Sequence, residues 1–334
     1  MPESPPPFDP ELAAVLDALP FTMPALSLEN LAEFRALPPF LPFQELLRDA
    51  GIAIRDARVD TADDSRITVS VLTPEDHTAS EGPGPGLYFI HSGGMISGDR
   101  WLGTESLIDW ILRYRLVVVT VDYRLAPEHP DPIPVEDCYA GLTWMASQAR
   151  ELGIDPERII VMGGSAGGGL AAGTTLLARD RRGPAIAGQL LMCPMLDDRD
   201  DTVSSRQFED LGTWTRPSNI TGWTALLGDR RGRDDVSIYA APARARAEDL
   251  SGLPPTFVDC GSADLFRDED VAYASAIWAA GGDADLHIWA GGFHGFDAIG
   301  RDAIVSRAAV AARTSWLERI LRRTAPASHT DTTS

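Results

Sequence analysis

Lysine is absent from this chain of 334 residues, so all 29 of its basic residues are arginine. Schiff-base chemistry, serine–lysine dyads and the phosphate-binding P-loop each need a lysine side chain, and the sequence therefore excludes them. A serine nucleophile in this chain must use another base, for which histidine is the best suited side chain.

Cysteine is scarce as well. The three cysteines, Cys138, Cys193 and Cys260, are odd in number, widely spaced and form no C-x-x-C pair. This pattern argues against a disulfide framework and against a zinc site, and it favours buried apolar thiols in a reducing compartment. We therefore expect no metal ion.

Positive charge is the third deficit, because 49 acidic residues against 29 basic ones give a net charge of −20. Such a surface repels nucleic acid and anionic membranes. No apolar run approaches membrane-spanning length, and residues 1–7 have neither the basic nor the apolar region of a signal peptide. We expect a cytoplasmic protein that binds neither nucleic acid nor membrane.

From about Ile52 onward, short apolar runs alternate with helical stretches. This alternation predicts an α/β fold, with a mostly parallel sheet covered by helices on both faces. The expected strands contain residues 67–72, 87–90, 116–121, 159–162, 189–193, 256–260 and 286–289, and the expected helices 103–114, 134–151, 166–180, 268–280 and 302–322.

Two regions depart from this alternation. Prolines break the apolar stretches before residue 50, which favours short helices, and residues 197–249 are polar without any strand pattern. We expect cap helices in 1–50, of which roughly the first ten residues are disordered. A catalytic domain in 51–323 then carries the 197–249 insertion as part of the cap, and 324–334 form a disordered tail.

One serine lies in a glycine-rich turn between an expected strand and an expected helix. The pattern Gly163-x-Ser165-x-Gly167 fits a nucleophile elbow, a strained turn that lifts a serine hydroxyl clear of the sheet. A Cβ at either glycine would collide with the facing strand and helix. The N–H of Ala166, at the helix N-terminus, would face a developing oxyanion. A glycine-rich turn with an inert serine is the alternative.

Three further segments each follow an expected strand. Adjacent Gly93 and Gly94 allow the close backbone approach that an oxyanion hole requires, and Asp264 stands at the sheet edge where α/β proteins build their sites. His294 lies in a glycine-flanked loop after the last strand. A glycine turn, a surface aspartate and a structural histidine are the alternatives for each segment alone. Together they give the order Ser165, Asp264, His294, which is the nucleophile–acid–base order of α/β-hydrolases.

A competing motif overlaps the elbow. Gly167, Gly169 and Ala172 match the dinucleotide fingerprint G-x-G-x-x-A, which needs an acidic residue at the end of the next strand. That strand ends in Pro194 and Met195 instead, so we expect no nucleotide cofactor.

The joint pattern resembles that of the hormone-sensitive-lipase-like family of α/β-hydrolases, the bacterial family IV carboxylesterases, over residues 87–296. HSGG at 91–94 resembles the family's HGGG motif, and GGSAGG at 163–168 resembles its GDSAGG motif. ADL at 263–265 resembles the family's DPL. The family's YRLAPEHP and HGF motifs are present unchanged at 123–130 and 294–296.

The resemblance implies an α/β-hydrolase fold with a helical cap and a serine carboxylesterase acting on short- to medium-chain esters, without metal or organic cofactor. It implies a triad of Ser165, His294 and Asp264, an oxyanion hole from the N–H groups of Gly93, Gly94 and Ala166, and compatibility with a homodimer. An amidase or lactonase with the same triad, and a non-catalytic small-molecule receptor on this scaffold, are the alternatives.

Two residues depart from the family pattern. Ser92 replaces the first glycine of HGGG, which restricts the oxyanion loop and adds a hydroxyl, and Gly164 replaces the aspartate that commonly precedes the nucleophile.

Other residues near these motifs are charged or aromatic. We expect Asp122, Arg124 and Glu128 to be structural charges that hold the glycine loop, whereas Trp214, Trp223 and Phe208 fit equally well as pocket lining or as the core of the cap.

Overall fold

The computed structural model describes residues 4–19, 25–79 and 82–323. Within this part, eight strands form one sheet in the order β1-β2-β4-β3-β5-β6-β7-β8. β1 pairs with β2 and β2 with β4 in antiparallel fashion, and the remaining pairs are parallel, which confirms the mostly parallel sheet. The strands are β1 (Ile52–Asp60), β2 (Arg66–Pro74), β3 (Gly84–Ile90), β4 (Val117–Asp122), β5 (Ile154–Gly164), β6 (Gly188–Met192), β7 (Thr256–Gly261) and β8 (Ala284–Trp289).

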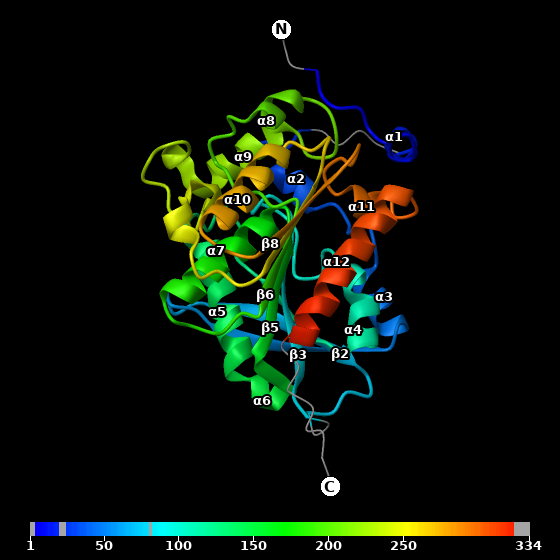
Figure 1. Ribbon diagram of the computed structural model, residues 1–334, viewed down its shortest axis with the longest axis vertical. Coiled ribbons are helices and arrows are strands. Elements are labelled where there is room, and N and C mark those ends of the chain that lie inside the picture. Colours follow the sequence, from blue (N-terminus) through cyan, green and yellow to red (C-terminus); the bar gives the residue numbers. More distant parts are fainter. Residues whose placement is uncertain (1–3, 20–24, 80–81, 324–334) are drawn as a thin grey trace.

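Helices cover both faces of the sheet (Figure 1). Successive side chains of a strand point to opposite faces, and β4 accordingly sends Val117, Val119 and Val121 to one core and Val118 to the other. The first face carries α5 (Ile133–Ser147), α6 (Ala149–Leu152), α7 (Ala166–Asp180) and α10 (Arg267–Ala279), and the second carries α3 (Phe43–Asp49), η2 (Thr104–Leu107), α4 (Ile108–Tyr114) and α12 (Ile304–Arg323).

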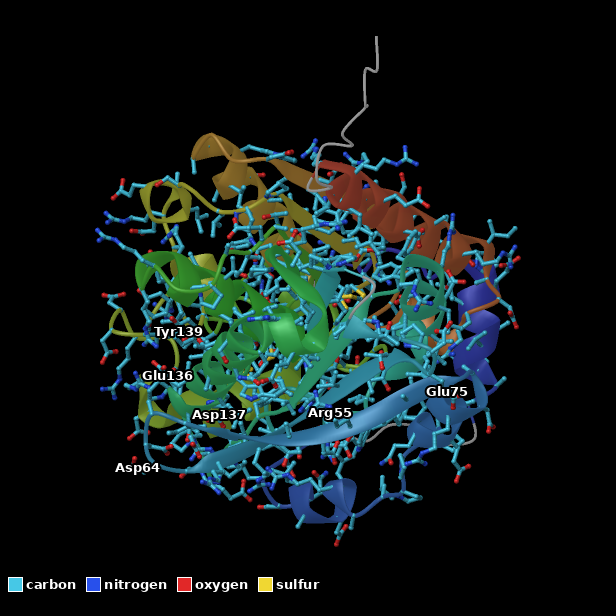
Figure 2. The ribbon with its side chains drawn as sticks, turned by 90° about the horizontal axis from the view of Figure 1, so that it is seen from below. Arg55, Asp64, Glu75, Glu136, Asp137 and Tyr139 are labelled. Carbon is cyan, nitrogen blue, oxygen red and sulfur yellow. The ribbon has the colours of Figure 1, made fainter. Side chains whose placement is uncertain are left out.

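The β1–β2 hairpin forms one edge of the sheet. Seen from below, it runs from the turn at Asp64 to Glu75 at its other end (Figure 2). β1 was not expected as a strand, because Ile52 and Val59 are its only buried residues. An edge strand with so few apolar positions gives little periodic signal in the sequence.

The 197–249 insertion contains short helices and no strand, as predicted. α8 and α9 lie together with α2 over one end of the sheet (Figure 1). The N–H of Leu26 donates to Ser218 Oγ of α9 over 2.9 Å, so the N-terminal region and the insertion touch. The elements are α1 (Pro10–Asp17), α2 (Leu31–Arg35), α8 (Val203–Gln207), α9 (Arg216–Leu227), η3 (Gly228–Arg230), η4 (Pro242–Arg244) and η5 (Ala247–Leu250).

The expected division into cap and catalytic domain stays a prediction, and α3, which falls in the 1–50 segment, packs against β1. The segment 4–10, expected to be disordered, is instead ordered. Phe8 packs edge-on against Phe293, and the Asp9 N–H donates to the Gly291 carbonyl over 3.0 Å. Residues 1–3 and the tail 324–334 lie outside the described residues. No helix in the described part of the chain has both the length and the apolar character that crossing a membrane requires.

Candidate active site

Ser165 occupies the tight turn between β5 and α7, with φ 54° and ψ −124°. Residues other than glycine rarely adopt such a positive φ, so the backbone of this turn is strained. A Cβ on Gly163 would lie 2.1 Å from the Gly167 carbonyl oxygen, and one on Gly167 would lie 2.2 Å from the Ile90 carbonyl oxygen. The two glycines therefore let α7 pack directly against the strands, as the sequence predicted.

The loops after three parallel strands bring the predicted Ser165, Asp264 and His294 side chains together. His294 Nε2 lies 2.9 Å from Ser165 Oγ, and His294 Nδ1 lies 2.9 Å from Asp264 Oδ2. An ionised carboxylate can only accept a hydrogen bond, so in the neutral imidazole Nδ1 carries the proton and Nε2 is left to accept the serine hydroxyl.

Asp264 is fully buried, and neighbouring groups hold its carboxylate in place. The N–H of Phe266 donates to its Oδ1 over 3.0 Å, and the Phe266 ring packs edge-on against the His294 ring. The Ala263 N–H donates to the Gly292 carbonyl over 3.0 Å. The aspartate and histidine loops are therefore held as one unit.

Two opposing effects set the pKa of His294. Burial disfavours the charged ring and lowers the pKa, but the adjacent charge of Asp264, the neighbouring Cys193 and the hydrogen bonds to both outweigh burial. The pKa of His294 consequently stands well above its ordinary value of 6.5.

The loop after β3 presents two amides near the elbow. Gly93 and Gly94 have φ values of 114° and 64°, which a side chain would disfavour. The Gly93 carbonyl accepts the N–H groups of Ile96 and Ser97 over 3.1 and 2.9 Å, which closes the loop into a tight turn. Among the described residues, no hydrogen bond uses the N–H of Gly93, Gly94 or Ala166.

A neutral histidine supports this loop. His91 is fully buried and stacks on Tyr123 with the ring centroids 4.1 Å apart. Burial lowers the pKa of His91 to about 4, so the ring is uncharged at neutral pH, and its Nδ1 lies 2.7 Å from the Ser92 carbonyl oxygen. As that oxygen can only accept, Nδ1–H is the donor.

The two departures from the family pattern are neighbours in space. The Ser92 hydroxyl donates to the Gly164 carbonyl over 3.0 Å. A Cβ added to Gly164 would lie 3.3 Å from Ser92 Oγ, tighter than an ordinary contact. Ser92 therefore fills space beside residue 164 and links the loop after β3 to the turn between β5 and α7.

The insertion reaches this site through the segment around Trp214 and through α9, where a Cβ on Gly222 would lie 2.8 Å from the Gly94 carbonyl oxygen. A Cβ on Gly94 would lie 2.4 Å from the Trp214 ring, and the rings of Trp214 and His294 are 6.4 Å apart. The Thr213 hydroxyl donates to the His294 carbonyl. Trp223 and Phe208 are instead fully buried in the core, so only Trp214 of the three aromatic candidates lies at the site.

Cys193 is the residue at this site that sequence reasoning missed. Its Sγ and the ligand atoms of Asp264 and His294 all lie within 4.8 Å of one another. Cys138 and Cys260 are buried as predicted, but Cys193 is partly exposed, so the buried-filler interpretation is wrong for it. Its position directly after β6, at the edge where the other site residues follow their strands, was the available signal.

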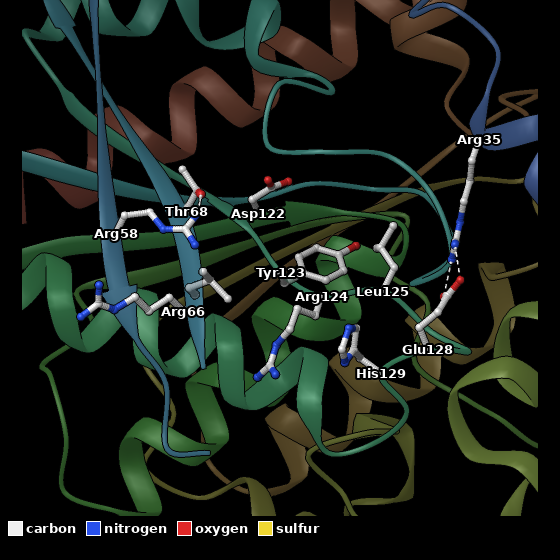
Figure 3. A pocket seen from close by; sticks show the side chains of 11 residues that line it. Arg35, Arg58, Arg66, Thr68, Asp122, Tyr123, Arg124, Leu125, Glu128 and His129 are labelled. Atoms are coloured by element: carbon white, nitrogen blue, oxygen red, sulfur yellow. Dashed lines mark hydrogen bonds and ion pairs between the residues drawn. The ribbon is translucent and has the colours of Figure 1, made fainter. Parts of the chain in front are cut away.

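The charged residues after β4 surround a separate cavity of about 380 Å³ (Figure 3). Arg35 pairs with Glu128 and also donates to the Ile96 carbonyl over 2.7 Å, so it ties α2 to the oxyanion loop. Arg124 pairs with the buried Asp137. Asp122 forms an ion pair with Arg100, and Arg124 forms a second ion pair with Asp63. These partners fit the structural roles expected for Asp122, Arg124 and Glu128.

Comparison with known proteins agrees with this geometry. Residues 87–298 match the family described as alpha/beta hydrolase fold. The chain is 33% identical over 290 residues to Esterase LipI of Mycobacterium tuberculosis, covering 84% of this chain and 85% of that protein. It is equally identical over 294 residues to Carboxylesterase NlhH of the same organism, covering 84% and 86%. Among solved structures, Bacterial Heroin Esterase is similar with a TM-score of 0.83 and 39% identity, covering 94% of this chain and 98% of the other. The chain therefore belongs to the α/β-hydrolase family, in its hormone-sensitive-lipase-like carboxylesterase branch.

Proposed function

We propose that this protein is a serine carboxylesterase in which Ser165 is the nucleophile, His294 the base and Asp264 the orienting acid. The observation that carries the proposal is the unbroken hydrogen-bond chain from Asp264 through both nitrogens of His294 to the Ser165 hydroxyl, with both links 2.9 Å long. A nucleophile, a base and an orienting group within hydrogen-bond reach are what acyl transfer requires.

In the first half of the reaction, Ser165 Oγ attacks the ester carbonyl carbon while its proton moves to His294 Nε2. The carbonyl oxygen becomes an oxyanion, for which the N–H groups of Gly93, Gly94 and Ala166 are the donors in this proposal. His294 then gives the proton to the leaving alkoxide, and an alcohol departs from the acyl-enzyme.

In the second half, a water molecule gives its proton to His294 Nε2 and attacks the acyl carbon. Collapse of the second tetrahedral intermediate breaks the bond to Ser165 Oγ, which takes the proton back from His294. The carboxylic acid leaves and the resting site is restored.

The substrate class in this proposal is short- to medium-chain esters. The Trp214 ring against Gly94 and the helices of the insertion over the end of the sheet support it, because they leave a covered site rather than an open lipid-facing surface. A p-nitrophenyl ester series should give its highest kcat/KM with short to medium acyl chains. A preference for long emulsified chains would contradict this part of the proposal.

We also propose that the protein is cytoplasmic. Its three cysteines are all unpaired thiols, which suits a reducing compartment.

Steady-state hydrolysis of p-nitrophenyl butyrate tests the triad. Ser165→Ala should lower kcat by roughly 10⁴-fold or more, because the nucleophile is lost. Ser106→Ala removes an exposed hydroxyl on η2 and is the matched control, with unchanged activity. Turnover that survives in Ser165→Ala would refute the assignment. The matched butyranilide, run in parallel, should be cleaved far more slowly than the ester.

A further inference from the structure

We propose that Cys193, Asp264 and His294 form a binding site for a thiophilic divalent cation, of which Zn²⁺ is the best fit, and that an occupied site stops ester hydrolysis. Binding itself depends only on the three side chains. The inhibitory effect rests on the proposed function, because it requires His294 to be the base.

The spacing of the three groups suits a metal ion. One ligand atom from each residue lies within 4.8 Å of the other two. His294 Nδ1 and Asp264 Oδ2 are themselves 2.9 Å apart. Zinc binds sulfur at about 2.3 Å and nitrogen or oxygen at about 2.0–2.2 Å, which puts neighbouring ligands roughly 3.3–3.7 Å apart in a tetrahedral shell. A small approach by the Cys193 side chain therefore completes three of the four positions.

The chemistry of the donor set favours zinc over the harder cations. One thiolate, one imidazole and one carboxylate form a mixed sulfur, nitrogen and oxygen set, which magnesium and calcium do not prefer. The thiolate of Cys193 and the carboxylate of Asp264 balance the two positive charges of the ion. This balance matters because Asp264 is fully buried, where an uncompensated charge is costly.

The site also has an entrance. Asp264 is buried, but Cys193 and His294 are both partly exposed, and the His294 side chain keeps 12% of its surface accessible. An ion can therefore reach the sulfur and the imidazole first and then contact the aspartate.

Occupation would disable His294 through its tautomer. Nδ1 faces Asp264, so a cation between Cys193 and Asp264 takes the Nδ1 lone pair. The proton that Nδ1 carried then resides on Nε2, and the Cys193 thiol releases its own proton to solvent. A ring protonated at Nε2 cannot accept the Ser165 proton. Inhibition should therefore lower kcat and not be relieved by excess substrate.

The first test titrates ZnCl₂ against p-nitrophenyl butyrate hydrolysis by wild type, Cys193→Ser and Cys193→Ala, each scaled to its own metal-free rate. Loss of the sulfur ligand should raise the half-inhibitory zinc concentration by about tenfold or more. Cys138→Ala removes a buried thiol elsewhere and should be inhibited like wild type. EDTA should restore activity. Equal zinc sensitivity of wild type and both Cys193 variants would overturn the proposal.

The second test measures binding without catalysis. Co²⁺ added to Ser165→Ala should produce a thiolate-to-cobalt charge-transfer absorption that saturates at one ion per chain, and Ser165→Ala/Cys193→Ser should lack it. Absence of a Cys193-dependent band would refute the metal site. This readout stands whether or not Ser165 proves to be the nucleophile, so failure of the site and failure of the proposed function are distinguishable.

Discussion

The serine and the histidine of the site are held in place by contacts of different kinds. Ser165 is held by closely packed backbone, since a Cβ on Gly163 would lie 2.1 Å from the Gly167 carbonyl oxygen and one on Gly167 would lie 2.2 Å from the Ile90 carbonyl oxygen. The His294 loop is held by segments far away in the sequence. Phe8 and Asp9 contact it from the N-terminus, and Thr213 contacts it from the insertion.

This difference predicts two kinds of response to substitution. Rigid, close-packed backbone has no alternative arrangement close by, so a change in the elbow should lower activity by a large factor. The histidine loop is held by several separate contacts, so loss of one should lower the rate by a limited factor. Substitutions in the two regions should therefore differ in how far they lower activity.

Gly167→Ala should have the largest effect. Its Cβ would lie 2.2 Å from the Ile90 carbonyl oxygen and 2.5 Å from that of His91, so α7 must move away from β3. Overpacking of this kind costs about 1–3 kcal/mol of stability, and a shift of about 1 Å in the reacting groups lowers the rate about 100-fold. Thermal unfolding and kcat/KM on p-nitrophenyl butyrate measure both effects.

Gly295→Ala is the matched glycine of the histidine loop. It has a φ of 70° but no atom within 4 Å of its added Cβ, so the only cost is backbone strain of about 1–2 kcal/mol. Its activity should remain well above that of Gly167→Ala. The reverse order of the two variants would contradict the contrast.

The pH dependence of kcat/KM should follow the protonation of His294. Asp264 raises the pKa of His294 well above 6.5, and His294 must be neutral to act as a base. Activity is therefore full above that raised pKa, and kcat/KM falls about tenfold per pH unit below it, with the midpoint above pH 6.5. A profile that stays flat down to about pH 5 would exclude His294 as the base.

Phe8→Ala should loosen the histidine loop. The Phe8 and Phe293 rings meet edge-on at 5.9 Å, and such a pair contributes about 0.5–1.5 kcal/mol beyond its buried area. We expect kcat to fall about two- to fivefold with KM nearly unchanged. Phe40→Ala is the control, because it removes a similar edge-on pair with Phe43, beside α3. Equal loss of kcat in both variants would mean that Phe8 acts only through general stability.

Ser92→Ala should have a small effect, similar in size to that of Phe8→Ala. It removes one hydrogen bond, of about 0.5–1.5 kcal/mol, between the oxyanion loop and the Gly164 carbonyl, while keeping the Cβ. A two- to tenfold decrease in kcat is expected if that free energy is lost in the transition state, and thermal stability should fall by no more than the same amount. Unchanged kcat would show that the link between loop and elbow has no catalytic consequence.

The same contrast explains how much the sequence could predict. Local patterns gave the elbow, the strands of the parallel sheet and the helix 166–180, which matches α7 at both ends. The order of Ser165, Asp264 and His294 gave the site because each residue follows a strand whose neighbours share one sheet edge. These features depend on short stretches of chain.

What the sequence could not give depends on packing between distant segments. The contact of Phe8 with Phe293, the position of Trp214 against Gly94 and the proximity of Cys193 to His294 join residues far apart in the chain. β1 was missed because its side chains are mostly exposed at a sheet edge. The coupling of Ser92 to Gly164 could not be predicted, because the two residues lie 72 positions apart in the chain.

The most direct test of the account is covalent labelling with a fluorophosphonate, followed by mass spectrometry of the digested protein. The account predicts one label per chain, located on Ser165, in wild type, and strongly slowed labelling in His294→Ala because the serine has lost its base. A label on another serine, or undiminished labelling of Ser165 in His294→Ala, would contradict the proposed site.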